Sequence, residues 1–372
     1  MRRLWPIIVL LLAGGCDLSG GGTYDWDLPP GFPEPQVPAD NPMSEQKVEL
    51  GRHLFYDPRL SGNETQSCAS CHAQGLAFTD GLGVSAGSTG EMTPRGSMSL
   101  TNVAYNSRQT WANPILVHLE DQALTPMFGE DPVELGTNEE DMLARLAADP
   151  AYPEMFADAF PGEAEPITTG NVVRAIASFE RTMISGDSAF DRYTYQGDDE
   201  AMSESARRGL ELFFSERLEC FHCHGGFNFT DGVTHSGTIE PEVGFHNTGL
   251  YNIDGRGGYP EPNRGLYEHT GDRRDMGLFR APTLRNIEVT APYMHDGSIA
   301  TLDEVLDHYA AGGRTIEDGP NAGVGSESPL KNLFIHGFEL SEQERADVLA
   351  LLRSLTDETF LNDPRFADPF AE

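Results

Sequence analysis

Basic residues are scarce in this chain. Of 372 residues, 59 are Asp or Glu and only 25 are Lys or Arg, which gives a formal net charge of −34 at pH 7. Lysine occurs only at Lys47 and Lys331. So large a negative charge argues against nucleic acid and anionic lipid as partners, because both would be repelled. It is compatible with a basic partner protein and equally with a well-solvated surface.

Long apolar runs are missing beyond the first residues. Arg2 and Arg3 precede a short apolar stretch, and small residues then lead to Cys16. Residues 1–16 therefore have the pattern of a bacterial lipoprotein signal, in which the cysteine is acylated and becomes the mature N-terminus. An ordinary signal peptide cleaved nearby is the alternative. We expect an exported lipoprotein on the periplasmic side or in the cell envelope, held by a lipid anchor on Cys16.

Cysteine is also sparse, and four of the five cysteines fall in two short runs. The runs are Cys68-Ala69-Ser70-Cys71-His72 and Cys220-Phe221-His222-Cys223-His224. C-x-x-C-H is the signature of covalently attached c-type haem: the thiols bond to the porphyrin and the histidine binds the iron. Paired zinc motifs usually recur within about 15–20 residues, far closer than these, and a thioredoxin-like pair needs no histidine. We therefore expect two haem c groups, and no thiol is left for a disulfide.

Helical signals dominate the rest of the sequence. Apolar residues repeat at helical spacing over 167–183, and Ser203 precedes a helix that leads into the second run. Capping patterns predict helices beginning at Thr137, Thr301 and Ser341. No alternating strand pattern persists, and many of the 40 glycines gather in stretches that we expect to be long loops packed over haem. The sequence predicts a mainly α protein of two cytochrome c-like helical domains, each with one covalent haem.

Changes in composition suggest where these domains begin and end. Residues 17–43 are rich in Gly, Pro and Asp, which predicts a tether between the lipid and the folded part. The folded part is expected to divide into an N-terminal haem domain, 44–197, and a C-terminal haem domain, 198–372.

Several longer motifs accompany the two haem-attachment runs. They are Leu50-Gly51-Arg52 with Leu54-Phe55-Tyr56-Asp57, Pro132-Val133-Glu134-Leu135-Gly136, Ala281-Pro282-Thr283-Leu284-Arg285-Asn286, and Thr290-Ala291-Pro292-Tyr293-Met294-His295-Asp296-Gly297. With them the chain resembles the bacterial di-haem cytochrome c peroxidase and MauG superfamily over roughly residues 44–355. Details at 110–114 and 179–186 resemble its MbnH branch, which is associated with peroxide-driven oxidation of a tryptophan on a copper-binding partner protein.

The resemblance implies that peroxide reacts at the N-terminal haem. Glu134 would be the acid–base group that moves a proton between the peroxide oxygens, and Gln122 would position the ligand. Pro126 would limit access. Two extra residues between Gln122 and Glu134, relative to the family pattern, bring Glu130 into competition for the acid–base role.

The same haem is expected to keep one open face. In typical peroxidases of this family, the loop after the first motif supplies a second histidine to the iron. Here no histidine occurs between His72 and His118, and the loop offers only Met92 and Met98 as soft ligands. We therefore expect a five-coordinate, high-spin iron with His72 as its proximal ligand. His118 is the competing sixth ligand.

The C-terminal haem is expected to be closed by a sixth ligand opposite His224. Where typical peroxidases place a methionine, fourteen residues after the position of His295, this chain has Tyr309, as in MauG. A phenolate oxygen is a hard donor that stabilises oxidised iron. Met294 and His308 are alternative ligands, and a purely structural role for Tyr309 in the helix core is also open.

Two further roles follow from the resemblance. Trp111 would be the bridging tryptophan that relays electrons between the haems. A calcium ion between the haems would take backbone carbonyls of Thr290 and Pro292. The family's usual asparagine ligand is replaced here, since Gly96 follows Arg95.

Together these features predict a haem-dependent peroxidase-type oxidoreductase. It would use hydrogen peroxide, through high-valent (bis-ferryl type) irons, to oxidise a tryptophan on a partner protein. The alternative enzyme is a di-haem cytochrome c peroxidase that takes electrons from a small cytochrome or copper protein. A plain electron-transfer cytochrome is a third interpretation, which Gln122 and Glu134 above an open iron disfavour. Tyr309 favours the first interpretation over the second.

Overall fold

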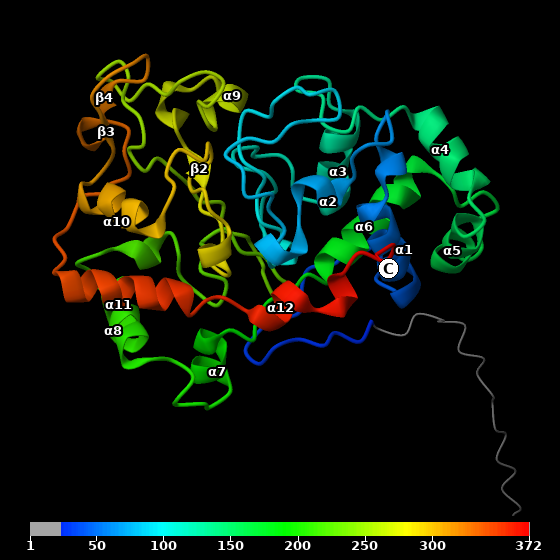
Figure 1. The fold of residues 1–372 in the computed structure, drawn as a ribbon, viewed down its shortest axis with the longest axis horizontal. Helices are drawn as coiled ribbons and strands as arrows, with labels where there is room; N and C mark the ends of the chain where they lie inside the picture. Colours follow the sequence, from blue (N-terminus) through cyan, green and yellow to red (C-terminus); the bar gives the residue numbers. More distant parts are fainter. Residues whose placement is uncertain (1–23, 372) are drawn as a thin grey trace, which may run out of the picture.

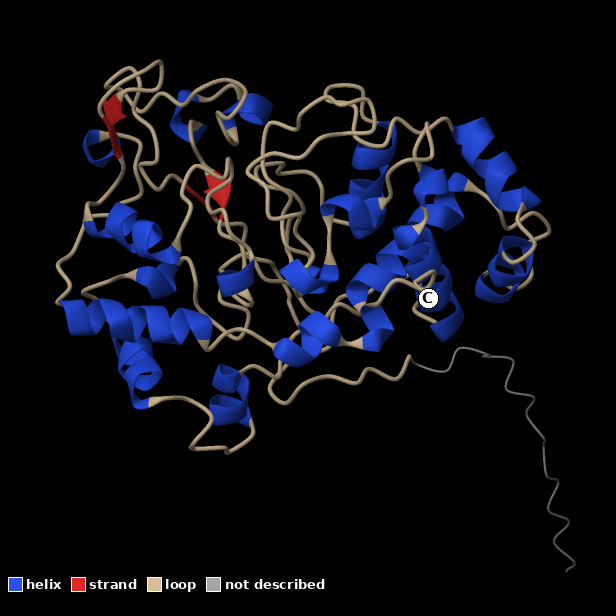
Figure 2. Ribbon diagram, in the orientation of Figure 1, coloured by secondary structure: helices blue, strands red, loops and turns tan. Residues whose placement is uncertain are grey.

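The computed structural model describes residues 24–371, so the signal sequence and the lipid anchor expected at Cys16 lie outside the described residues. Helices dominate the fold (Figures 1 and 2). They are α1 (Glu45–Tyr56), α2 (Cys68–Cys71), α3 (Leu119–Phe128), α4 (Glu139–Ala148), α5 (Tyr152–Ala159), α6 (Thr169–Arg181), α7 (Ala189–Tyr195), α8 (Glu204–Phe213), α9 (Tyr267–Thr270), α10 (Leu302–Ala310), α11 (Glu342–Arg353) and α12 (Glu358–Asn362).

The strands are short and form two separate antiparallel pairs. One pair joins β1 (Phe245–His246) to β2 (Phe279–Arg280), and the other joins β3 (Thr315–Ile316) to β4 (Gly323–Val324). Long loops connect the helices (Figure 2). The prediction of a mainly α protein with long loops is confirmed. No helix within residues 24–371 has the length and hydrophobicity needed to cross a bilayer.

Each half of the molecule is built around one pair of crossing helices. In the N-terminal half α1 crosses α6, and in the C-terminal half α8 crosses α11 (Figure 1). A glycine lies at each crossing: a Cβ on Gly51 would come within 1.9 Å of the Ala175 carbonyl oxygen, and one on Gly209 within 2.0 Å of the Asp347 carbonyl oxygen. The helix that precedes each haem motif is therefore held in direct backbone contact with the last long helix of its half.

Each helix pair has its own apolar core. The first core includes Leu54 of α1 and Phe179 of α6, and the second includes Phe213 of α8 and Leu351 of α11. The C-terminal segment leaves the second half and packs Phe360 into the first core. The described C-terminal segment therefore reaches α1, where Arg52 donates to the Ala367 carbonyl oxygen (Figure 1).

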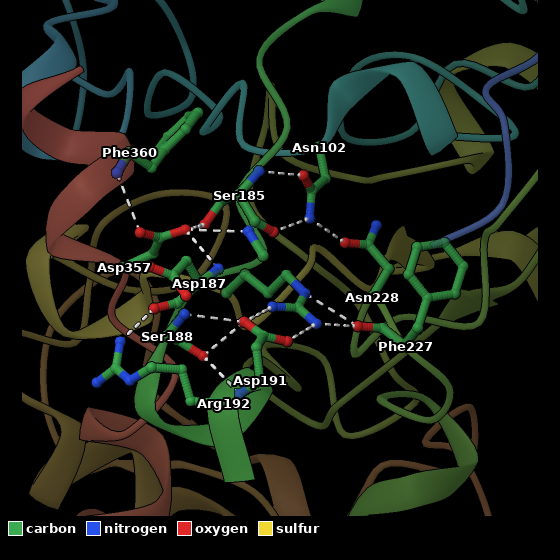
Figure 3. A network of polar contacts seen from close by, with 12 residues as sticks. Asn102, Ser185, Asp187, Ser188, Asp191, Arg192, Phe227, Asn228, Asp357 and Phe360 are labelled. Atoms are coloured by element: carbon green, nitrogen blue, oxygen red, sulfur yellow. Dashed lines mark hydrogen bonds and ion pairs between the residues drawn. The ribbon is translucent and has the colours of Figure 1, made fainter. Parts of the chain in front are cut away.

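A buried polar network joins the two halves (Figure 3). Asn102 and Asn286 both adopt a left-handed backbone conformation, with φ of 57° and 61°. The side-chain oxygen of Asn102 accepts from the Ser185 backbone N–H, four residues after α6, and that of Asn286 accepts from the Asp357 N–H, four residues after α11. Asn102 also donates to Asn228 of the other half at 2.9 Å. The network repeats one local design in both halves and fixes them against each other.

An ion pair lies within this network. Arg285 donates to both carboxylate oxygens of Asp191 at 2.8 Å, and neither side chain is more than 1% exposed. The guanidinium also donates to the Phe227 carbonyl and lies 4.8 Å from the centre of the Phe32 ring. Phe32 belongs to the segment 17–43 that we expected to be a tether. From residue 24 that segment lies along the folded body, with Phe32 buried.

The predicted helix starts can be compared with the structure. Ser203 caps α8, and Thr301 and Ser341 form capping boxes at α10 and α11, as predicted. The prediction that Thr137 caps the helix after it is wrong. Asn138 caps α4, because the Thr137 hydroxyl donates to the Leu60 carbonyl oxygen at 2.6 Å instead.

Candidate functional site

Both C-x-x-C-H runs form tight helical turns that bring their two thiols to one side. Cys68 and Cys71 are the ends of α2, which begins with a capping box between Ser67 and Ser70. The second run forms a 3₁₀ turn over Cys220–His222. All four cysteines are free thiols. Neither run forms a disulfide, so the thiols of both runs are available for attachment to haem.

The two proximal histidines are held in the same way. The Nδ1 atom of His72 lies 2.7 Å from the Phe78 carbonyl oxygen, and that of His224 lies 3.1 Å from the Phe229 carbonyl oxygen. Both phenylalanines have positive φ, which turns their carbonyls toward the rings. Burial lowers the pKa of both histidines, so the neutral rings donate from Nδ1 and keep the Nε2 lone pair free. This is the orientation that metal-binding histidines require.

An open cavity lies beside the first run. Cys68, Cys71 and His72 form one wall. Helix α3 and the loop after it supply the residues expected over the iron. The lining residues of this kind are Gln122, Pro126 and Glu134. The structure therefore brings the predicted peroxide-site residues to the predicted haem-attachment site.

Glu134 is positioned by backbone hydrogen bonds on both sides of it. The Ser88 N–H donates to the Glu134 carbonyl oxygen at 2.6 Å, and the Leu135 N–H donates to the Pro126 carbonyl oxygen at 2.8 Å. Burial raises the pKa of the Glu134 carboxyl. The competing Glu130 is exposed and does not line the cavity. Glu134 therefore has the placement that an acid–base group needs, and Glu130 does not.

The alternative sixth ligands for this haem lie elsewhere. His118 is exposed, caps α3, and lines a different cavity with Gln109 and Arg181. Met92 is 54% exposed. The Met98 sulfur lies 3.5 Å from the Arg280 guanidinium. None of the three lines the cavity beside His72.

The cavity contains one acidic residue that was not expected from the sequence. Glu180 lies near the end of α6, is 5% exposed, and lines the cavity with Glu134 and Gln122. Its Oε2 atom is buried without a hydrogen-bond partner among the described residues. Burial raises the pKa of Glu180 to about 8, so it is a neutral acid at pH 7. The signal available in the sequence was an acidic residue within an otherwise apolar helix face.

The C-terminal half places Tyr309 beside the second run. Tyr309 lies on α10, and burial, followed by the nearby Cys223 and Cys220 thiols, raises the pKa of its phenol. The alternative ligand His308 is buried on the same helix, and neither of its ring nitrogens has a hydrogen-bond partner among residues 24–371. Met294 has a positive φ of 71° and packs against the second core.

Several buried polar atoms in this half have no hydrogen-bond partner within residues 24–371. They include both ring nitrogens of His308 and the Nε2 atom of His295. Buried polar groups in folded proteins are almost always hydrogen-bonded, so such atoms indicate a group that binds there. Haem, with its iron and its two propionates, supplies ligands and acceptors of this kind. The free thiols, the oriented histidines and these atoms all fit covalent haem in both halves.

Trp111 connects the two halves close to these sites. Its Nε1–H donates to the Gly96 carbonyl oxygen at 2.9 Å, and its own carbonyl oxygen accepts from the Arg280 N–H in β2. The Trp111 and His295 ring centres lie 6.5 Å apart. Its position suits the predicted relay between the haems.

The expected calcium ligands lie in a turn of the C-terminal half. Residues Ile287–Val289 form a 3₁₀ turn that ends at Thr290, and the Thr290 hydroxyl donates to the Ile287 carbonyl oxygen at 3.2 Å. The residues that the structure describes contain no cluster of three or more His, Cys, Asp or Glu side chains that could hold a metal ion. A site made of the Thr290 and Pro292 carbonyls stays a prediction.

Comparison with known proteins gives consistent relatives. A family profile described as di-haem cytochrome c peroxidase matches residues 45–200. The methylamine utilization protein MauG of Methylorubrum extorquens is 34% identical over 96% of this chain and 97% of its own length. The cytochrome-c peroxidase IdrP1 of Denitromonas iodatirespirans is 35% identical over 96% of this chain and 95% of its own.

The similarity extends to a solved structure. A crystal structure of a MauG-like protein associated with microbial copper homeostasis is 53% identical and superimposes with a TM-score of 0.92. The match covers 94% of this chain and all of that one. The arrangement of helices around the two C-x-x-C-H runs is therefore shared with a characterised fold.

Proposed function

The chain belongs to the di-haem cytochrome c peroxidase and MauG family of haem-dependent oxidoreductases, and we propose that it uses hydrogen peroxide to oxidise a tryptophan on a partner protein. The partner would be of a copper-binding type. This finer assignment draws support from the MauG-like relative associated with microbial copper homeostasis, which is 53% identical.

The observation that carries the proposal is Tyr309. Tyr309 is half-buried on α10, close enough to Cys223 and Cys220 for their thiols to help raise the pKa of its phenol, and its oxygen would hold the second haem together with His224. An anionic oxygen ligand stabilises oxidised iron, so this haem is suited to store an oxidising equivalent. A methionine at that place would suit a haem that accepts electrons from a donor cytochrome.

The N-terminal half would bind and activate peroxide. Haem, when bound, would supply iron with two-electron oxidising chemistry. His72 would hold that iron, because its Nδ1–H is fixed by the Phe78 carbonyl oxygen. The amide of Gln122 positions the peroxide, and Pro126 limits what enters. Glu134 takes a proton from the inner peroxide oxygen and returns it to the outer oxygen, so that water leaves.

Trp111 would carry electrons between the two halves. It bonds to the Gly96 carbonyl of one half and lies against His295 of the other. In the proposed division, haem domain 44–197 contains the peroxide site, and haem domain 198–372 contains the second haem, which would store an oxidising equivalent. The partner protein then needs only to dock within electron-transfer range, and the protein needs no deep pocket for a bulky substrate.

Three accompanying assignments belong to the proposal. Calcium would bind backbone carbonyls of Thr290 and Pro292. The protein would act on the periplasmic side of the cell envelope, held by a lipid on Cys16 after removal of the residues that precede Cys16. The acidic surface disfavours nucleic acid as a partner.

A second candidate function is peroxide removal with electrons from a small cytochrome or copper protein. The 35% identity to the peroxidase IdrP1 favours it. The two functions differ in where the electrons come from: a mobile donor in one, and a side chain of the docked partner in the other.

One experiment separates the two functions. The purified di-haem protein is treated with peroxide, once with a reduced small cytochrome c and once with the protein encoded by the neighbouring gene. We expect little turnover of the cytochrome, a long-lived near-infrared absorption band, and oxygen addition to a tryptophan of the neighbour, read by peptide mass spectrometry. Rapid, sustained oxidation of the cytochrome with an unmodified neighbour would establish the peroxidase instead.

A further inference from the structure

An aromatic branch leads away from Trp111 into the C-terminal half. Ring centres are 6.5 Å apart between Trp111 and His295, 6.3 Å between His295 and Tyr259, and 5.4 Å between Tyr259 and Tyr251. All of these rings except Trp111 are buried. Tyr259 is also close enough to Tyr309 to contribute to its raised pKa. The branch therefore touches both the proposed relay and the proposed ligand of the second haem.

The branch ends at a carboxylate. The Tyr251 hydroxyl donates to Oδ2 of Asp296 at 2.6 Å, while the Ser298 N–H donates to Oδ1 of the same carboxylate at 3.1 Å. Burial of Asp296 opposes its ionisation, but the neighbouring His295 and these hydrogen bonds outweigh it and lower the pKa of the carboxyl. Burial and the bond to Asp296 raise the pKa of Tyr251 to about 12. At neutral pH the pair is a phenol bonded to a carboxylate.

This pairing distinguishes Tyr251 from its neighbour. Tyr259 donates its hydroxyl hydrogen to the side-chain oxygen of Asn247 at 2.9 Å. An amide oxygen is far too weak a base to take a proton from a phenol, whereas a carboxylate can accept it. One-electron oxidation of a buried tyrosine is favourable only when the phenolic proton has somewhere to go. Tyr259 can pass an electron, and Tyr251 can remain oxidised.

We propose that Tyr251 and Asp296 form a proton-coupled redox site that holds one oxidising equivalent inside the protein. The proposal rests on the proposed function, because peroxide-oxidised haem is its oxidant. One electron leaves Tyr251 through Tyr259 and reduces that oxidant by one equivalent. The O–H bond of Tyr251 breaks, and the proton forms a new O–H bond on Asp296. Return of one electron reverses both transfers, since the proton has moved only across one hydrogen bond.

The burial of Tyr251 indicates that the oxidising equivalent is stored there and is not passed directly from Tyr251 to a partner. At 6% exposure its ring offers a docked partner almost no contact surface. A radical at this place is shielded from solvent reductants and from other protein molecules. The equivalent held there stays connected to Trp111 and is therefore available when a partner binds.

The chain contains a matched control for this pair. Tyr152 also donates to a carboxylate, Oδ2 of Asp57, at 2.6 Å, and is also buried. Its aromatic contacts are with Phe156 in the first core, on the far side of α1 from the second half. The Asp57 carboxylate also accepts from the Arg59 guanidinium, so the pair Tyr152–Asp57 shares the phenol–carboxylate hydrogen bond and lacks the branch to Trp111.

The test generates the radical in two ways in the ferric di-haem protein. One sample receives peroxide, and a second receives hexachloroiridate(IV), a one-electron oxidant that needs no peroxide chemistry. Rapid-freeze EPR then follows the tyrosyl signal in the wild type, Tyr251→Phe, Asp296→Asn and Tyr152→Phe. We expect loss of the signal in Tyr251→Phe and in Asp296→Asn, and an unchanged signal in Tyr152→Phe.

A tyrosyl signal of unchanged shape and yield in Tyr251→Phe would overturn the proposal with either oxidant. Tyr251→Phe keeps the ring and the packing, so it stays informative if Asp296→Asn disturbs folding. The iridate sample distinguishes a failure of this proposal from a failure of the proposed function. If the protein does not activate peroxide, the tyrosyl signal is lost in the peroxide sample but remains in the iridate sample. Oxidation of the partner tryptophan is measured separately, and its absence leaves the iridate result intact.

Discussion

Gly51 in α1 lies so close to Ala175 in α6 that a Cβ atom on the glycine would stand 1.9 Å from the alanine carbonyl oxygen. Both helices are embedded in one core, so neither can retreat without opening it. We expect Gly51→Ala to lower the free energy of unfolding by about 3 kcal/mol through overpacking. The shift in the midpoint of urea unfolding measures this loss of stability.

Gly170→Ala, at the start of the same helix α6, is the control. Its new Cβ would meet nothing nearer than the Thr168 hydroxyl at 3.9 Å. Alanine is the better helix former by about 1 kcal/mol, so this variant should be neutral or slightly more stable. Equal losses in the two variants would show that close helix contact is not the cause.

The buried ion pair between Asp191 and Arg285 supports a second prediction (Figure 3 shows the network around Asp191). Asp191→Asn keeps the shape but leaves the Arg285 charge buried without a counter-charge, which should cost about 3–5 kcal/mol of unfolding free energy. Arg217→Ala removes an exposed pair with Glu344 and should cost less than about 1 kcal/mol. Chemical denaturation of both variants compares the two losses. A small loss for Asp191→Asn would mean that the other bonds of the network suffice.

The sequence predicts those parts of this molecule that depend on local spacing. The thiols and histidine of each motif are fixed within five residues, and Ser203, Thr301 and Ser341 cap their helices through neighbours three residues away. The prediction for Thr137 was wrong because its hydroxyl donates to the Leu60 carbonyl oxygen, which is distant in sequence. A local sequence pattern cannot reveal a hydrogen-bond acceptor that lies far away along the chain.

Glu180 shows the same limit within the candidate site. Its carboxyl lines the cavity only because α6 packs beneath α3 and turns this position toward Cys68. Helical periodicity places it beside an apolar stripe and cannot say which cavity it meets. The duplicated asparagine network at Asn102 and Asn286 was likewise invisible, since each bond joins residues more than seventy positions apart.

Glu180 also predicts how stability depends on pH. Its folded pKa is about 8, above the ordinary value of 4.5. Between these values the unfolded chain releases a proton that the folded protein keeps, so stability falls as pH rises through this window. We expect Glu180→Gln to match the wild type in stability near pH 4.5 and to exceed it increasingly toward pH 8. Thermal unfolding across this range measures the difference. The exposed Glu211→Gln should show no such trend, and a pH-independent difference for Glu180→Gln would contradict the prediction.

Glu134 and Glu130 offer a direct test of the acid–base assignment. Glu134 lines the cavity beside His72, whereas Glu130 is exposed. Glu134→Gln removes the group that moves the peroxide proton, and should slow the reaction of the ferric protein with peroxide by on the order of 10²-fold. Stopped-flow absorbance measures this rate, with haem content as a check on assembly. Glu130→Gln should react at the wild-type rate; if it is the slow variant, the two roles are reversed.

Tyr309→Phe tests the sixth ligand of the C-terminal haem. The substitution keeps the ring and its packing on α10 and removes only the phenol oxygen, so haem attachment through Cys220 and Cys223 should be unaffected. Without an oxygen donor opposite His224, that iron should change from low spin to high spin, read by EPR of the ferric protein. Tyr259→Phe is the control, because it removes a hydroxyl from a buried ring near Tyr309 without touching α10. A low-spin signal that survives in Tyr309→Phe and disappears in His308→Ala would assign the iron to the neighbouring histidine, and the case for a haem that stores an oxidising equivalent would lose its main support.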